Sequence, residues 1–236
     1  MKHNILYITI DDKKSPLGWL LAAVYLPMIM ALNWVPSTQP YIGSCIVTLL
    51  TFAAVILIFR DFWHQSIQEI PVTGMQLLYK PLLAALLCKI AIVFFCDIAL
   101  LYQLNYFTPT EWGPMLWDAR AYAWSGTFRA QPVLTVLTLA MIMPITEEFL
   151  FRGVIFGKLY EKNSLLALIV SCLAFAAFHT IPYIAYMPDQ IFPGFFFMQY
   201  LLMAIGLAWL YTGTNSIFAP ILMHIIYNLA LIQNMV

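Results

Sequence analysis

Three short polar patterns interrupt apolar stretches in the second half of this 236-residue chain. They are Glu147-Glu148-x-x-x-Arg152, Phe175-x-x-x-His179 and His224-x-x-x-Asn228. An ionisable side chain at the centre of a membrane helix costs about 2.5–3.5 kcal/mol on insertion scales. Two acids, one arginine and two histidines are more than helix packing requires, so the combined patterns indicate a functional site.

Hydrolysis is the chemistry that these residue types suit best. Glu147 is the candidate general base, which would take a proton from water so that the water attacks a carbonyl carbon. The oxyanion that forms then needs preorganised hydrogen-bond donors. His179, His224 and the side-chain amide of Asn228 are the candidates for that role.

Glu148 and Arg152 are predicted to support this site. They stand four residues apart, so their side chains can pair on one helical face, while Glu147 is turned about 100° away. The pair would neutralise the arginine and leave Glu147 as the active carboxylate. Each motif taken alone has a structural alternative, because such pairs are often structural and a lone histidine or Asn228 often hydrogen-bonds to a neighbouring helix.

Zinc binding is an alternative chemistry for the same residues. Glu147, His179 and His224 would supply a set of two histidines and one carboxylate that leaves one position open. The chain contains no HExxH pattern, in which both histidine ligands and the base come from one short helical stretch. We therefore predict that the site works without a cofactor, with zinc as the alternative.

The composition places these residues in a membrane. Hydrophobic residues make up 63% of the chain, charged residues only 9%, and the mean hydropathy is +0.85. Soluble domains average about 25% charged residues. The net charge is zero and no basic tract is present, which argues against a nucleic-acid partner. The four cysteines lie in apolar runs and are predicted to be small buried hydrophobes.

Apolar stretches of about 20 residues predict an all-α, polytopic transmembrane bundle of seven or eight spans. The chain is expected to be one membrane domain over residues 1–236. The candidate spans are 16–35, 42–59, 80–104, 132–158, 163–181, 191–211 and 215–234. Segment 60–79 is expected to be a loop, and segment 105–131, with tryptophans among charges, is typical of a membrane interface or part of an eighth span.

Lysine and arginine positions predict a cytoplasmic N-terminus. Lys13 and Lys14 precede the first span, and Lys158 and Lys162 flank a later turn on the same side. Seven spans would then place the C-terminus outside. At about 1.5 Å of rise per residue, the three motifs come to similar depths if the 132–158 helix continues through the acidic pair despite Pro144.

In this order on successive apolar segments, the motifs resemble the CPBP family, which comprises type II CAAX prenyl proteases and bacterial bacteriocin-processing or bacteriocin-immunity (Abi) relatives. The resemblance covers about 130–234, whereas residues 1–131 read as variable N-terminal spans. It implies an intramembrane endopeptidase with Glu147 activating water, His179, His224 and Asn228 completing the site, and Glu148 and Arg152 beside it. The family has been described both as metalloproteases and as glutamic proteases, and the lack of HExxH favours the glutamic mechanism.

The compact chain looks like bacterial members, which implies a bacterial cytoplasmic membrane. A membrane-associated protein or peptide is then the expected substrate, in peptide maturation, bacteriocin self-immunity or cleavage of a membrane-anchored protein. Two other classes remain open. A non-catalytic membrane protein could confer immunity by binding a toxin or its receptor, and a proton-coupled transporter could relay protons through buried Glu and His. The lack of an internal repeat weakens the transporter hypothesis.

Overall fold

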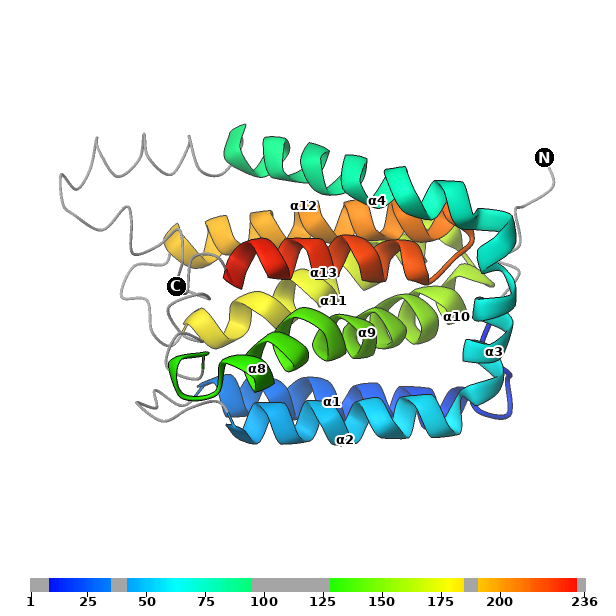
Figure 1. Ribbon diagram of the computed structural model, residues 1–236, viewed down its shortest axis with the longest axis horizontal. Helices are drawn as coiled ribbons and strands as arrows, with labels where there is room; N and C mark the ends of the chain where they lie inside the picture. Colours follow the sequence, from blue (N-terminus) through cyan, green and yellow to red (C-terminus); the bar gives the residue numbers. More distant parts are fainter. Residues whose placement is uncertain (1–8, 35–41, 95–127, 185–190, 233–236) are drawn as a thin grey trace, which may run out of the picture.

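The computed structural model describes residues 9–34, 42–94, 128–184 and 191–232. Within these ranges the regular elements are all helical and no strand occurs, which confirms the predicted all-α fold. The long helices run side by side as a bundle (Figure 1). Among the described residues, five helices are long and apolar enough to cross a membrane, or up to six if a bent pair counts as one span. The protein is an integral membrane protein.

The bundle combines single long helices with one composite helix. The long helices are α1, Ser15–Trp34; α2, Ile42–Ile58; α4, Ile70–Ile92; α11, Ser164–Ile184; α12, Ile191–Thr214; and α13, Phe218–Ile232. The composite helix is built from α8, Pro132–Thr135; the π-helix η2, Val136–Ile142; α9, Met143–Glu148; the π-helix η3, Phe149–Phe156; and α10, Gly157–Tyr160. A short helix, α3, Arg60–Gln68, follows α2.

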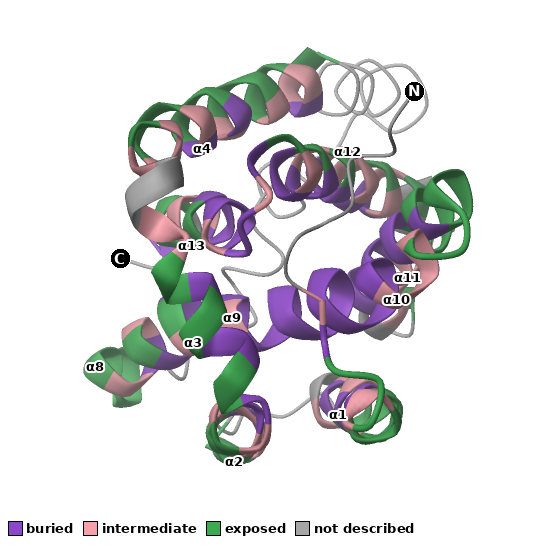
Figure 2. Cartoon of the chain, turned by 90° about the vertical axis from the view of Figure 1, so that its right-hand side faces the viewer, coloured by how far each residue is buried: buried purple, intermediate pink, exposed green. Residues whose placement is uncertain are grey.

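The composite helix is the most buried of the candidate spans. The share of residues buried inside the protein is 61% for its span Pro132–Tyr160. The corresponding shares are 22% for Ser15–Leu32 of α1 and 33% for Gly74–Ile92 of α4. Figure 2 shows this helix as mainly buried, whereas α4 and α1 turn exposed faces outward. Charged groups on the composite helix are therefore shielded from lipid by neighbouring helices, which is where such groups are tolerated.

The composite helix runs through the acidic pair, as predicted. Pro144 does not end it, because α9 begins at Met143 and the proline lies in its first turn. Proline lacks a backbone N–H. In the first turn of an α-helical segment this costs little, because an N–H there would have no hydrogen-bond acceptor within that segment. The change from π-helical to α-helical hydrogen bonding just before Pro144 provides such a start without interrupting the helix.

Segment 60–79, which we predicted to be a loop, is helical. It contains α3 and the first part of α4, which starts at Ile70 and not at the expected residue 80. α3 meets α2 at an angle of 75° and crosses the end of the bundle (Figure 1). Phe62 and Trp63 are buried on one side of α3, whereas Asp61 and His64 are exposed. Such a short amphipathic helix is missed by a search for long apolar runs.

The count of seven or eight spans is not confirmed. α13 has 15 residues, fewer than the predicted 215–234 and fewer than the about 20 that a span requires. The end of the predicted span 80–104 and most of segment 105–131 lie outside the described residues. The predicted spans 16–35, 42–59, 163–181 and 191–211 correspond closely to α1, α2, α11 and α12.

Ion pairs gather at the end of the bundle where α3 lies. Lys14 Nζ is 2.6 Å from Asp61 Oδ2, and Lys158 Nζ is 2.8 Å from Asp12 Oδ1. At the same end, Lys80 on α4 donates a hydrogen bond to the backbone oxygen of Gly213, at the C-terminal end of α12. These contacts join the segment before α1 to α3 and α10, and they join α4 to α12.

Aromatic packing connects α3 to the acidic segment. The ring of Phe149, the residue after Glu148, lies 4.8 Å from Phe59, 5.4 Å from Phe62 and 5.8 Å from Trp63, measured between centroids. Phe149 is fully buried. Aromatic pairs in this distance range add about 0.5–1.5 kcal/mol each beyond the area that they bury. The cluster therefore fixes the start of η3 relative to the end of the bundle.

Candidate active site

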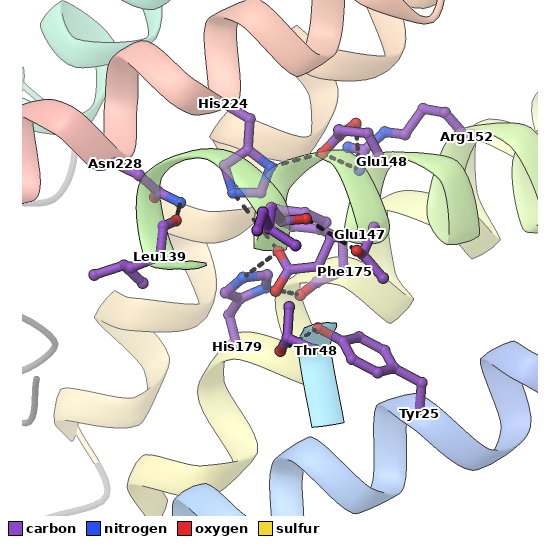
Figure 3. Close-up of polar contacts among 12 residues, drawn as sticks. Tyr25, Thr48, Leu139, Glu147, Glu148, Arg152, Phe175, His179, His224 and Asn228 are labelled. Carbon is purple, nitrogen blue, oxygen red and sulfur yellow. Dashed lines mark hydrogen bonds and ion pairs between the residues drawn. The ribbon is translucent and has the colours of Figure 1, made fainter. Parts of the chain in front are cut away.

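Glu147, His179 and His224 converge from α9, α11 and α13 on one buried point (Figure 3). Glu147 Oε2 lies 3.4 Å from His179 Nε2 and 3.6 Å from His224 Nε2. One oxygen or nitrogen atom of each residue lies within 4.8 Å of the other two. Their side chains are 1%, 6% and 0% exposed, respectively. The structure thus brings these predicted residues together in one layer of the bundle.

The predicted pair of Glu148 and Arg152 forms behind this point. Arg152 Nη1 lies 3.1 Å from Glu148 Oε2 with both side chains fully buried, and Arg152 Nη2 donates to the backbone oxygen of Ala204 on α12. Glu148 Oε1 is also 2.8 Å from His224 Nδ1. Glu148 therefore does more than neutralise the arginine, because it also orients one of the two histidines.

Each histidine uses Nδ1 for a fixed partner and points Nε2 at Glu147. His179 Nδ1 lies 2.9 Å from the backbone oxygen of Phe175, which can only accept a hydrogen bond. His224 Nδ1 faces the Glu148 carboxylate, which accepts when ionised. In its neutral form, each imidazole would therefore carry its proton on Nδ1 and direct the lone pair of Nε2 toward Glu147.

The two glutamates reach the same imidazole because they are neighbours on a helix. Adjacent residues project about 100° apart, so Glu147 and Glu148 approach opposite nitrogens of His224. The acidic pair closes α9, and π-helical segments lie on both sides, at 136–142 and 149–156. π-Helical turns occur frequently at functional sites, where they change the direction in which side chains project.

Two polar side chains fasten neighbouring helices to these π-helical segments. Asn228 Nδ2 on α13 donates to the backbone oxygen of Leu139 in η2 at 2.8 Å. Ser171 Oγ on α11 donates to the backbone oxygen of Phe151 in η3 at 3.0 Å. Asn228 thus makes the interhelical bond that was its structural alternative, and it lies one turn after His224 on α13.

Sequence reasoning missed Tyr200 and the ring of Phe175 as parts of the site. Tyr200 lies on α12 outside the three polar motifs, yet its ring lies 4.6 Å from that of His179. The Phe175 ring lies 4.3 Å from His179. The four-residue spacing of Phe175 and His179 could have suggested a contact on one helical face, but no pattern places Tyr200.

The remaining polar candidates lie apart from this cluster or outside the described residues. Lys89 is exposed on α4, and Asp97 lies outside the described residues. His64 is exposed on α3. The thiols described are free and at least partly buried, at Cys45, Cys88 and Cys172, which agrees with their expected role as small hydrophobes.

The family comparison covers the part of the chain that holds the cluster. Residues 129–230 match the family model described as type II CAAX prenyl endopeptidase, Rce1-like. All three motifs lie inside these limits, in the order on which the resemblance rested. This segment is similar to the CPBP family. The helices α1, α2, α3 and α4 precede the CPBP match and pack around it.

Two curated relatives also match over less than half of the chain. The Bacillus subtilis (strain 168) protein named "Putative membrane peptidase YdiL" is 31% identical over 97 residues, which are 40% of this chain and 34% of YdiL. The Lactococcus lactis subsp. lactis (strain IL1403) protein named "UPF0177 protein YxdF" is 30% identical over 93 residues, 39% of this chain and 44% of YxdF. The chain thus spans less than half the length of these relatives. No solved structure matches it.

Proposed function

We propose that this protein is an intramembrane endopeptidase that hydrolyses a peptide bond of a membrane-associated protein or peptide, with Glu147 activating the water. The proposal is carried by the convergence of Glu147, His179 and His224 at a buried point within one helical bundle. A carboxylate and two imidazoles at this distance can hold one water molecule and manage its protons. The match of residues 129–230 to the type II CAAX prenyl endopeptidase model supports the same reaction class.

Charge balance suggests how the site operates without a metal. Glu147, Glu148 and Arg152 carry a formal charge of minus one when both histidines are neutral, and all five side chains are buried. One additional proton makes the cluster neutral, which a membrane interior favours. Because Nδ1 of each histidine is already bonded, the mechanism places this proton on Nε2 of His179 or His224, which leaves Glu147 ionised as the base.

The reaction then needs only proton transfers between these groups. Glu147 takes a proton from water, and the hydroxide oxygen bonds to the peptide carbonyl carbon. The resulting oxyanion accepts a hydrogen bond from a protonated imidazole, and the side-chain amide of Asn228 is the second candidate donor. When the C–N bond breaks, the amine leaving group takes the proton from Glu147. Glu148 and Arg152 hold His224 in place throughout.

Zinc is the alternative, and the donor atoms fit it. Bonds of about 2.0 Å in a tetrahedral site put ligand atoms about 3.3 Å apart, close to the 3.4 and 3.6 Å that separate Glu147 Oε2 from the two Nε2 atoms. Bound zinc would polarise the carbonyl and acidify a water. Glu147 would then be a ligand, and Glu148, held by Arg152 and His224, could not replace it as the base. We therefore favour the metal-free glutamic mechanism.

The charged end of the bundle supports an orientation of the protein in its membrane. Lys14, Lys80 and Lys158 lie at the end where α3 crosses, whereas Arg129 precedes α8 at the opposite end. An excess of lysine and arginine marks the cytoplasmic side. We propose a bacterial cytoplasmic membrane, a cytoplasmic N-terminal end of α1, and a role in peptide maturation or bacteriocin self-immunity.

The decisive experiment compares N-terminal peptides in membranes of cells that express wild type or Glu147→Gln at matched levels, by mass spectrometry. Removing a general base lowers the rate about 100- to 10 000-fold, so we expect wild-type-dependent peptide termini to disappear. Glu161→Gln is the matched control, because it makes the same change at an exposed turn and should leave the new termini intact.

Identical peptides in both strains, with the Glu147→Gln protein still folded, would contradict the protease and favour a non-catalytic immunity protein. The metal question has its own measurement on the purified active protein. The glutamic mechanism predicts less than stoichiometric zinc by elemental analysis and full activity after dialysis against a chelator. One bound zinc per chain, with activity lost on chelation and restored by zinc, would replace it with the metal alternative.

A further inference from the structure

His179 is the third member of a continuous stack of planar side chains. The guanidinium carbon of Arg152 lies 4.6 Å from the centroid of the Phe175 ring. Phe175 lies 4.3 Å from the His179 ring with an interplanar angle of 32°. His179 in turn lies 4.6 Å from the Tyr200 ring at 29°. The stack joins the composite helix, α11 and α12.

Phe175 and Tyr200 enclose the imidazole between them. Each ring is inclined to His179 by about 30°, with its centroid less than 5 Å away, so the two rings cannot share one face of the small imidazole and must cover opposite faces. Phe178 meets the ring edge-on at 5.0 Å and 87°. The hydrogen bond from Nδ1 to the Phe175 backbone oxygen stops rotation in the ring plane. Nε2 is thereby held toward Glu147.

α12 holds both ends of this stack. Ala204 accepts a hydrogen bond from Arg152 Nη2 through its backbone oxygen, and Tyr200, one turn earlier on α12, covers His179. The contacts therefore form a closed ring from α12 through Arg152, Phe175 and His179 back to α12. Phe175 and Phe178 lie on the same helix as His179 and move with it. Of these stacking partners, Tyr200 is the one that fixes the imidazole relative to another helix.

We propose that Tyr200 is a positioning residue for His179: its ring closes the stack and keeps Nε2 of the imidazole aimed at Glu147 and its water. This inference rests on the proposed function, in which His179 takes part in proton transfer. It assigns the effect to the aromatic ring of Tyr200, which makes the stack. It predicts that an aliphatic side chain of similar volume will not substitute.

The kinetic test compares Tyr200→Leu, Tyr200→Phe and a matched control on the same helix. Tyr211 is also a buried aromatic of α12, but it packs edge-on against Phe156, so Tyr211→Leu makes the same change away from His179. A misplacement of about 1 Å costs about 100-fold in rate, and we expect that loss of kcat for Tyr200→Leu with little change in KM. Tyr200→Phe should lose no more than about fivefold, the equivalent of one neutral hydrogen bond.

A spectroscopic measurement tests the stack without relying on activity. The chain has four histidines, so ¹³C-labelled histidine gives a spectrum simple enough to assign by single substitutions. Ring currents from Phe175 and Tyr200 should shift the His179 Hε1 signal upfield. Tyr200→Leu should move this signal downfield, whereas Tyr200→Phe and Tyr211→Leu should leave it in place.

The outcomes separate the two proposals. If wild type cleaves substrate and Tyr200→Leu keeps its kcat per folded molecule, or loses no more than Tyr211→Leu, the positioning role is wrong. A His179 signal that does not move in Tyr200→Leu also overturns it. If wild type and Glu147→Gln are equally inactive on every peptide while the His179 signal behaves as expected, the stack exists but the proposed endopeptidase function fails.

Discussion

Two ion pairs of this protein differ more in their surroundings than in their geometry. Lys14 and Asp61 approach to 2.6 Å, but their side chains are 31% and 63% exposed. Arg152 and Glu148 are 3.1 Å apart, and both are fully buried. Water screens the shorter pair, so its loss changes little. Removing one member of the buried pair strands a charge away from water, which is costly although the contact is longer.

The two pairs also differ in what they connect. Lys14 to Asp61 joins two surface segments at the charged end of the bundle, whereas Arg152 contacts Glu148, the Phe175 ring and the Ala204 backbone oxygen. Through Glu148 it also supports His224. Arg152 and Glu148 therefore belong both to the candidate site and to the packed interior, whereas the surface ion pair belongs to neither.

Arg152→Met gives the largest expected effect on this comparison. It leaves the buried Glu148 carboxylate without its charged partner, and we expect the free energy of unfolding to fall by about 3–5 kcal/mol. Unfolding by SDS titration in mixed micelles measures it. Lys14→Met is the control and should shift the midpoint by no resolvable amount. Equal effects of the two substitutions would mean that burial does not distinguish the pairs.

Arg152→Lys sharpens the comparison by separating charge from shape. Lysine keeps the positive charge near Glu148, but its ammonium lacks the planar fork that reaches Ala204 and lies over Phe175. We expect an intermediate loss of about 1.5–3 kcal/mol, the value of a hydrogen bond to a charged group. If Arg152→Lys unfolds at the wild-type midpoint, charge alone explains the role of Arg152 and the stack contributes nothing.

The smallest expected effect concerns Asp12, which pairs with Lys158 at the water-exposed end. The hydrogen bond from Lys158 lowers the pKa of the Asp12 carboxyl below its usual 3.8. A lowered pKa in the folded state means that the pair stabilises the protein above about pH 4 and that this contribution disappears as the pH falls through the lowered value. The difference in unfolding midpoint between wild type and Asp12→Asn should therefore be small at pH 6 and become smaller as the pH falls below 3.8. A difference in unfolding midpoint that grows as the pH falls would show that the ionised Asp12 carboxyl does not stabilise the protein.

The sequence predicted the membrane class and the polar cluster for reasons that are local. Apolar runs of span length and the cost of buried charge pointed to Glu147, Glu148, Arg152 and both histidines, and helical geometry alone paired Glu148 with Arg152. The loop prediction for segment 60–79 was wrong, because charged residues interrupt the apolar face of its short helix. The predicted number of spans is not confirmed. Whether the predicted residues are catalytic stays a prediction.

By itself, the sequence determined that five ionisable groups enter the membrane on three helices, because periodicity and composition depend only on residues close together in the chain. Tertiary packing decided the rest. Which nitrogen of His224 faces Glu147 depends on α13 and α9 meeting at one angle, and the cover on His179 depends on α12 placing Tyr200 there. Side chains more than a few turns apart in sequence meet only when helices pack, and the energy of that packing is spread over many contacts that no short pattern encodes.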